Sequence, residues 1–118
     1  MTVYEAVKIC DNLRPNNFSD EIKCSWLYEL DGKVNAEIFE NKFEIPLYNV
    51  TEHKNKELLI DTPYDDLYLI FMISKIDLYS GEYARYSNDA LVFNTEYLDF
   101  MRYKSRTKEV KKSKFKVV

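Results

Sequence analysis

The chain has 118 residues, enough for one domain that buries roughly two-thirds of the surface its unfolded chain would expose. It contains only 2 glycines and 3 prolines, which argues against a turn-rich all-β sandwich or barrel. The net charge of −3 hides an asymmetry: residues 102–118 carry a net +7, so residues 1–101 carry −10. These values predict an acidic body with a basic tail.

Residues 2–13 have the pattern of a short first helix. Thr2 and Glu5 have the spacing of a capping box, and apolar residues recur on one face of the helix. Pro15 disfavours helical backbone at the preceding residue, so the helix should end there. Because this stretch carries charged residues throughout, it does not resemble a signal peptide, and we expect the protein to work without crossing a membrane.

A second helix is predicted over residues 20–39. Ser19 is a good N-cap residue, and apolar residues follow at helical spacing. Trp26 is interpreted as a core residue rather than an anchor for a partner. Gly32 within this segment suggests a tight helix crossing or an early helix end.

Residues 41–60 form the least regular region. Residues 43–50 alternate well enough for a short strand, but Pro46 would confine that strand to an edge. The prediction is a long loop or a short β-hairpin. A stretch of this length in a compact domain usually has a functional reason, such as docking on a neighbour.

A third helix is predicted to start near residue 62. Thr62 (or Asp61) would cap it, and Pro63 suits the first helical position. Residues 67–79 are apolar on nearly every side, as expected for the central helix of a bundle. The segment is too short and too interrupted by charge to span a membrane.

The fourth predicted helix covers residues 82–103. Gly81 favours a short turn, so the third and fourth helices should pack antiparallel as a hairpin. Aromatic residues recur along the fourth helix at steps of three and four and serve as core or as subunit contacts. The stripe comprises Tyr83, Tyr86, Ala90, Phe93, Tyr97, Phe100 and Tyr103.

Residues with reactive side chains give little support to an enzyme. His53 is the only histidine and is expected to be exposed in a polar run. Cys10 and Cys24 fall within helical patterns and are expected to be reduced thiols rather than a disulfide. With two glycines there is no phosphate-binding loop. We predict no catalytic residues, no cofactor and no metal site. The carboxylates expected at helix starts or facing solvent are Asp65, Asp66, Glu82, Asp89, Glu96 and Asp99.

Residues 105–118 are predicted to be a basic tail, separate from a helical domain over residues 1–104. Alone in water this tail should be extended and disordered. Its lysines and apolar residues suit phosphate neutralisation on a nucleic acid, or an arm that docks on another protein, while a merely solvated tail is the plainest alternative.

An ordered set of short motifs covering about residues 2–103 resembles the small head–tail connector (adaptor) proteins of tailed bacteriophages that infect low-GC Gram-positive bacteria. The matching motifs are Pro15-Asn16, Ile22-Lys23, Trp26-Leu27-Tyr28-Glu29-Leu30-Asp31-Gly32, Pro63-Tyr64-Asp65-Asp66-Leu67-Tyr68, Lys75-Ile76-Asp77, Glu82-Tyr83-Ala84-Arg85-Tyr86-Ser87-Asn88 and Phe93-Asn94.

The resemblance implies a mainly all-α, four-helix bundle-like subunit of a ring, commonly of twelve copies, beneath the portal protein. Such a ring extends the DNA channel, without sequence-specific binding, and is a platform for the next neck or tail protein. The expected location is the neck of the virion, and the bacterial cytoplasm before assembly. The resemblance brings no catalytic residues.

Two sets of contact residues are predicted on this basis. The portal-docking set is Arg102, Lys104, Arg106, Lys108, Lys111, Lys112, Lys114, Phe115, Lys116, Val117 and Val118. The set assigned to subunit interface or core is Trp26, Tyr64, Tyr68, Phe71, Tyr83, Tyr86, Phe93 and Tyr97. The alternatives are a small DNA-binding regulator that uses the basic tail, although residues 1–101 offer no basic helix face, and a tail-side stopper or completion protein.

Overall fold

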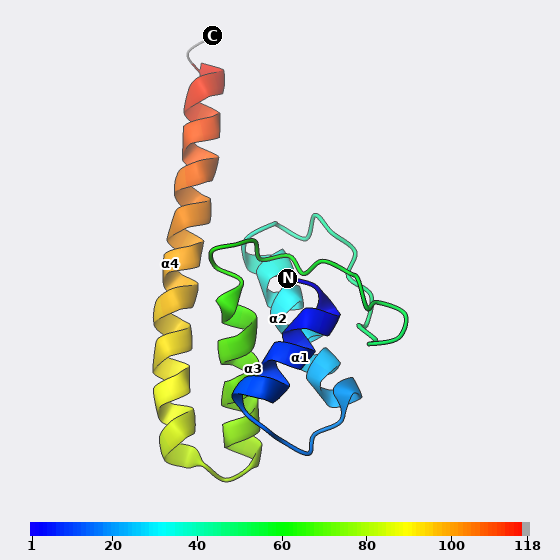
Figure 1. Ribbon diagram of the computed structural model, residues 1–118. Helices are drawn as coiled ribbons and strands as arrows, with labels where there is room; N and C mark the ends of the chain where they lie inside the picture. Colours follow the sequence, from blue (N-terminus) through cyan, green and yellow to red (C-terminus); the bar gives the residue numbers. More distant parts are fainter. Residues whose placement is uncertain (117–118) are drawn as a thin grey trace.

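The computed structural model describes the backbone of residues 1–116 and the side chains of residues 1–108. The described residues form four α-helices, which confirms the mainly all-α class (Figure 1). The helices are α1 (Val3–Leu13), α2 (Asp20–Glu37), α3 (Asp66–Tyr79) and α4 (Tyr83–Lys116).

The starts of α1 and α2 follow the predicted capping. The Thr2 hydroxyl accepts the backbone N–H of Glu5 at 3.1 Å, and the Glu5 carboxylate accepts the N–H of Thr2 at 3.3 Å. Ser19 caps α2 by accepting the N–H of Ile22 at 3.2 Å. The interpretation of Gly32 was wrong: α2 continues to Glu37, and a Cβ at Gly32 would meet nothing within 4 Å, so neither a crossing nor a helix end occurs there.

The predicted start of α3 was also wrong. Residues 61–64 close a turn of their own, in which the Tyr64 N–H donates to the Asp61 carbonyl at 2.9 Å. The helix therefore begins only at Asp66, and neither Thr62 nor Pro63 occupies the predicted capping or first helical position. The reason is that hydrogen bonds of the local turn replace those of a first helical turn.

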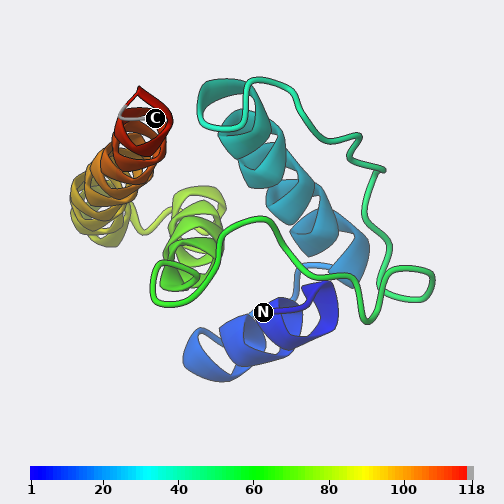
Figure 2. The same cartoon turned by 90° about the horizontal axis from the view of Figure 1, so that it is seen from above.

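The α3–α4 hairpin is confirmed, and its turn is a Schellman motif. The Gly81 N–H donates to the Leu78 carbonyl at 3.2 Å, and the Glu82 N–H donates to the Asp77 carbonyl at 2.9 Å. Gly81 has φ +79°, a left-handed backbone that glycine adopts without steric cost. The two helices run antiparallel, side by side (Figures 1 and 2).

Helix α3 is the centre of the fold, as its composition predicts. It packs against all three other helices, whereas the α4 backbone lies close to α3 alone (Figure 2). Its buried residues therefore face several neighbours. They are Leu67, Tyr68, Leu69, Met72, Ser74, Ile76 and Asp77.

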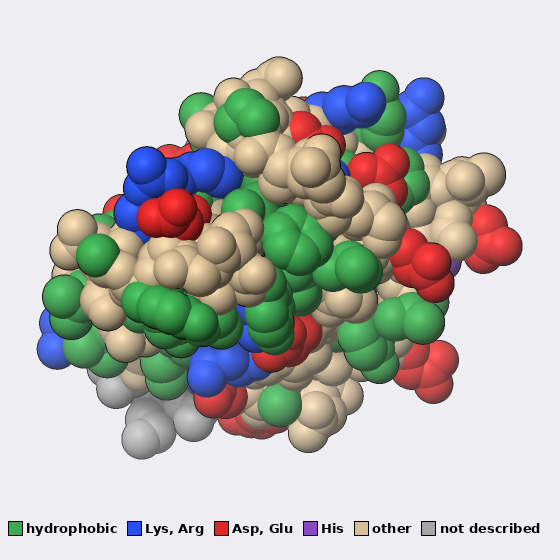
Figure 3. Space-filling model, turned by 90° about the horizontal axis from the view of Figure 1, so that it is seen from below, with side chains coloured by type: hydrophobic (Ala, Val, Ile, Leu, Met, Phe, Trp, Pro, Cys, Tyr) green, Lys and Arg blue, Asp and Glu red, His purple; other side chains and the backbone are tan. Residues whose placement is uncertain are grey.

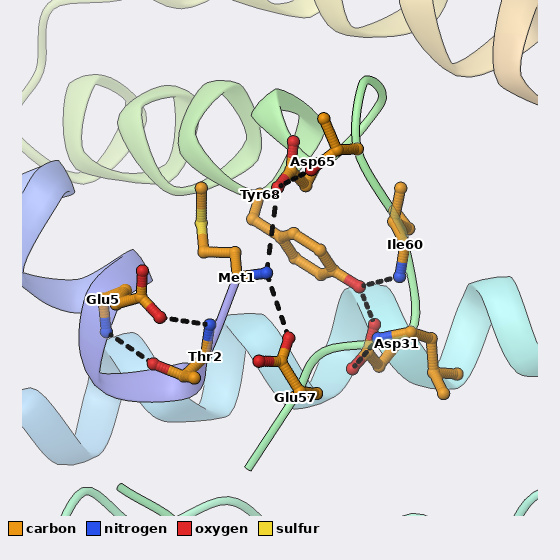
Figure 4. A network of polar contacts seen from close by, with 10 residues as sticks. Met1, Thr2, Glu5, Asp31, Glu57, Ile60, Asp65 and Tyr68 are labelled. Carbon is orange, nitrogen blue, oxygen red and sulfur yellow. Dashed lines mark hydrogen bonds and ion pairs between the residues drawn. The ribbon is translucent and has the colours of Figure 1, made fainter. Parts of the chain in front are cut away.

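The segment between α2 and α3 is a long loop, and the predicted β-hairpin does not form in it. The loop is held to the N-terminus by an isolated antiparallel bridge between Thr2 and Glu57. The N-terminal amine also lies 3.1 Å from the Glu57 carboxylate and 3.8 Å from that of Asp65, as Figure 4 shows. The N-terminus thus takes the place of a partner strand and joins the loop to the start of α3.

Residues 105–116 do not form the predicted extended tail. The backbone of α4 continues as one helix to Lys116 and projects beyond the other helices (Figure 1). Once a helix is nucleated, each further residue adds a hydrogen bond at small entropic cost, and lysine and arginine have good helix propensity. Val117 and Val118 lie outside the described residues.

Candidate protein-binding surface

Most of the aromatic residues predicted for the core or a subunit interface belong to the core. Trp26, Tyr68 and Tyr97 are buried, at 5%, 0% and 7% exposure. Tyr64, Phe71, Tyr86 and Phe93 are half-buried. Tyr83, at 67% exposure, is the member of this set whose ring is largely free for contact with another molecule.

The rings of α4 attach it to α3 along one side. Phe93 lies 5.4 Å from Phe71 and 5.5 Å from Tyr97, and Phe100 lies 5.4 Å from Tyr64, all as centroid separations. The Tyr97 hydroxyl donates to the Glu37 carboxylate at 2.6 Å, which ties α4 to the end of α2. The side chains on this side of α4 therefore pack within the subunit and stabilise its fold.

A buried polar cluster around Asp31 fixes the long loop, and the sequence did not reveal it. Asp31 is fully buried and accepts hydrogen bonds from the Tyr48 hydroxyl at 2.6 Å and from the Tyr68 hydroxyl. The Tyr68 oxygen in turn accepts the Ile60 N–H at 2.7 Å (Figure 4). Burial raises the pKa of the Asp31 carboxyl, and the two tyrosine donors counteract that effect. The cluster has a structural role, because each of the named polar groups forms a hydrogen bond with another group of the cluster.

A second buried group, also missed, lies between α3 and α4. Asp77 is 1% exposed and binds the Arg14 guanidinium at 2.9 Å, and its carboxyl group meets that of Asp89. Burial and the adjacent Asp77 raise the pKa of Asp89 to about 6. The prediction that Asp89 faces solvent was wrong, because α4 turns it toward α3. The available signal was Asp77, one of the few charged residues within a largely apolar helix.

The other reactive side chains have structural surroundings. Cys10 and Cys24 are buried and free of a disulfide, as predicted, and burial raises the pKa of each thiol to about 11. His53 is half-buried rather than freely exposed, and its Nδ1 accepts the Asn49 N–H at 3.0 Å. It closes a turn of the long loop.

The basic residues of the predicted docking set lie along the projecting end of α4. Arg102 and Arg106 are exposed, and Arg102 lies 4.0 Å from the Asp99 carboxylate, a weak surface contact. Lys104 lies over the Phe39 ring at 5.4 Å, and Lys108 pairs with Glu40 at the end of α2. The side chains of Lys111, Lys112, Lys114, Phe115 and Lys116 lie outside the described residues, although the helical backbone carries them.

Among the exposed hydrophobic side chains of the described residues, two groups lie on or beside α4. One is at the end of the molecule where α3 turns into α4, where Leu13, Tyr79 and Tyr83 are 58%, 59% and 67% exposed. Figure 3 views this end and shows hydrophobic patches between charged side chains. The other is on α4 itself, where Leu91 and Leu98 are 67% and 44% exposed. Such surfaces are typical of interaction sites.

Comparison with models of known families, with curated proteins and with solved structures gave no match. Within the described residues, no helix has both the length and the apolar character to cross a membrane. Along α4, the described surface combines exposed hydrophobic residues with exposed cations toward the projecting end.

Proposed function

We propose that this protein is a head–tail connector of a tailed bacteriophage. In this role many copies form a ring beneath the portal protein, DNA passes through the ring, and the next neck or tail protein attaches to it. The acidic body, with −10 over residues 1–101, suits a channel wall that must release DNA rather than bind it.

The observation that carries the proposal is the form of α4. Its inner side is attached to the body by aromatic rings, its outer side exposes Leu91 and Leu98, and its end projects with a high density of cations. A subunit with uncovered apolar residues on one helix and a charged projection is suited to assembly with copies and partners. The ordered motifs shared with connector proteins point the same way.

In this function the end of α4 binds the portal protein. A helix carries its cations in a fixed arrangement, so docking on an acidic groove costs less conformational entropy than docking of an extended arm. The lysines pair with acidic residues of the portal, and Phe115 with the two terminal valines contributes apolar contact.

The test measures binding of the full-length protein to its portal protein by light scattering and negative-stain electron microscopy. The wild type should join the portal as a ring of many copies. The variant Lys112→Glu/Lys116→Glu should keep its helix content but lose portal binding. Lys8→Glu/Lys54→Glu, which changes the charge equally on the exposed surface of the body, should bind as the wild type does. Equal binding by both variants would contradict docking through α4.

A DNA-binding regulator remains the second candidate because residues 102–118 carry a net +7 on one helix that reaches Lys116. A salt-sensitive shift of duplex DNA that disappears on deletion of residues 109–118, with no binding to the portal, would favour it. A ring that binds the tail-side protein but not the portal would indicate a stopper or completion protein.

A further inference from the structure

Seven exposed positions along one side of α4 form an uncharged stripe. They are spaced by alternating steps of three and four residues, which is the spacing of core positions in a coiled coil. The outer stripe comprises Ala84, Ser87, Leu91, Asn94, Leu98, Met101 and Ser105. Asn94 borders a hollow against α3, and Met101 and Ser105 border a hollow against the end of α2.

The outer stripe is distinct from the side of α4 that packs on α3. The packed side contains Phe93, Tyr97 and Phe100, whereas Leu91, Leu98 and Met101 remain 67%, 44% and 36% exposed. The stripe spans 22 residues, or ~33 Å of helix. None of the seven positions of the stripe carries a charge, whereas 31% of the residues of the chain are charged.

We propose that the outer stripe is the surface through which one copy of this chain packs head-to-tail on a second copy. The inference rests on the proposed function, since a head-to-tail contact repeated with closure produces a ring. The stripe meets a different surface of the neighbouring copy, not the neighbour's own stripe.

The charges around the stripe favour a second copy of this chain as the occupant. The stripe ends among the exposed cations Arg102 and Arg106, so its partner must combine apolar residues with acidic ones. The body of the same chain offers this combination at the start of α2, where Ile22 is 43% exposed and follows Asp20 and Glu21.

Two stripes paired with each other in parallel would bring the basic ends of both α4 helices together, at an electrostatic cost. Head-to-tail packing instead places Arg102 and Arg106 against an acidic body, while the cations farther along α4 stay available to the portal. Asn94 lies between Leu91 and Leu98 in the middle of the stripe and adds specificity, because its amide favours the register in which it finds a hydrogen-bond partner.

The first test compares two variants with the same change in charge. Leu91→Glu/Leu98→Glu places two charges on the stripe, and Asn88→Glu/Val92→Glu places two on exposed positions of α4 outside it. Both should keep the helix content and melting transition of the wild type. The stripe variant should require a concentration roughly tenfold or more higher for ring formation on the portal, and the control should assemble normally.

The second test places a photo-reactive residue at position 98 (Leu98→p-benzoylphenylalanine) in a mixture of ¹⁴N- and ¹⁵N-labelled full-length protein. Cross-links that join labelled to unlabelled chains and map to residues 1–82 would support head-to-tail packing. Cross-links to α4 of another copy, to the portal alone, or to no chain would overturn it.

The outcomes separate this inference from the proposed function. Normal rings from the stripe variant would overturn the inference and leave the connector role intact. Self-association that depends on the stripe, without any binding to the portal, would support the inference and contradict the connector role. A wild type that neither self-associates nor forms rings would overturn both.

Discussion

The Asp77 carboxyl group on α3 interacts with that of Asp89 on α4, and Arg14 at the end of α1 donates to Asp77 Oδ1 at 2.9 Å. Asp77 Oδ2 and Asp89 Oδ2 are both buried without a hydrogen-bond donor. A proton on Asp89 would let its carboxyl group donate to Asp77, whereas two ionised groups repel each other across the hairpin.

This pair predicts how stability depends on pH. The pKa of Asp89 is about 6 in the folded protein, above the ~3.9 of an aspartate in an unfolded chain, so the folded state binds more protons between these values. Stability should therefore fall as the pH rises from about 4 to about 6. Asp89→Asn should remove the loss of stability that the ionisation of Asp89 causes, and it should raise the melting temperature by a few degrees at pH 7. Thermal melts at several pH values measure this change in stability, with the exposed Asp99→Asn as the control. Identical profiles for the wild type and Asp89→Asn would contradict the raised pKa of Asp89.

The Asp31 cluster predicts that removal of a single hydroxyl group lowers the free energy of unfolding substantially. Tyr68→Phe removes a donor to the buried carboxylate and leaves the Ile60 N–H without its acceptor. We expect a loss of about 1–3 kcal/mol in the free energy of unfolding. Urea denaturation measures the loss, and Tyr28→Phe, in which the altered ring is 38% exposed, should change stability little. Equal stability of the two variants would show that the cluster contributes nothing.

The two glycines should respond to alanine with opposite signs. Gly32→Ala should stabilise the protein by about 0.5–1 kcal/mol, because the Cβ at this helical position meets no other atom. Gly81→Ala should destabilise it by about 1–2 kcal/mol, because the turn requires φ +79°. Chemical denaturation of both variants in one buffer tests the pair, and a stabilising Gly81→Ala would refute the Schellman turn.

Capping and turn residues in the sequence correctly predicted those element ends that depend on neighbouring residues. Three such predictions are confirmed: the capping box of Thr2 and Glu5, the Ser19 cap and the Gly81 turn. They could be predicted because each depends on residues close in sequence. The central place of α3 followed from its apolar composition, which requires cover on several sides.

The features that sequence reasoning missed depend on distant parts of the chain. Asp31 and Tyr68 are 37 residues apart, and nothing local pairs them. The start of α3 depended on a competing turn, and the continuation of α4 depended on a helix already formed before the basic segment begins. The Asp77–Asp89 pair required the geometry of the hairpin, although a charge inside an apolar helix was visible in the sequence.

The continuity of α4 has a mechanical consequence. Its 34 residues make a stiff rod ~51 Å long, which packs on α3 over the part nearer Gly81 and contacts the end of α2 through Lys104 and Lys108. A tilt of ~10° about the last aromatic contact at Tyr103 moves the far end by only ~3 Å. Because the helix is continuous, a displacement of its far end is transmitted to the packing between α3 and α4, whereas a flexible linker would absorb the displacement. A load applied at the tip is thus transmitted into the body of the subunit.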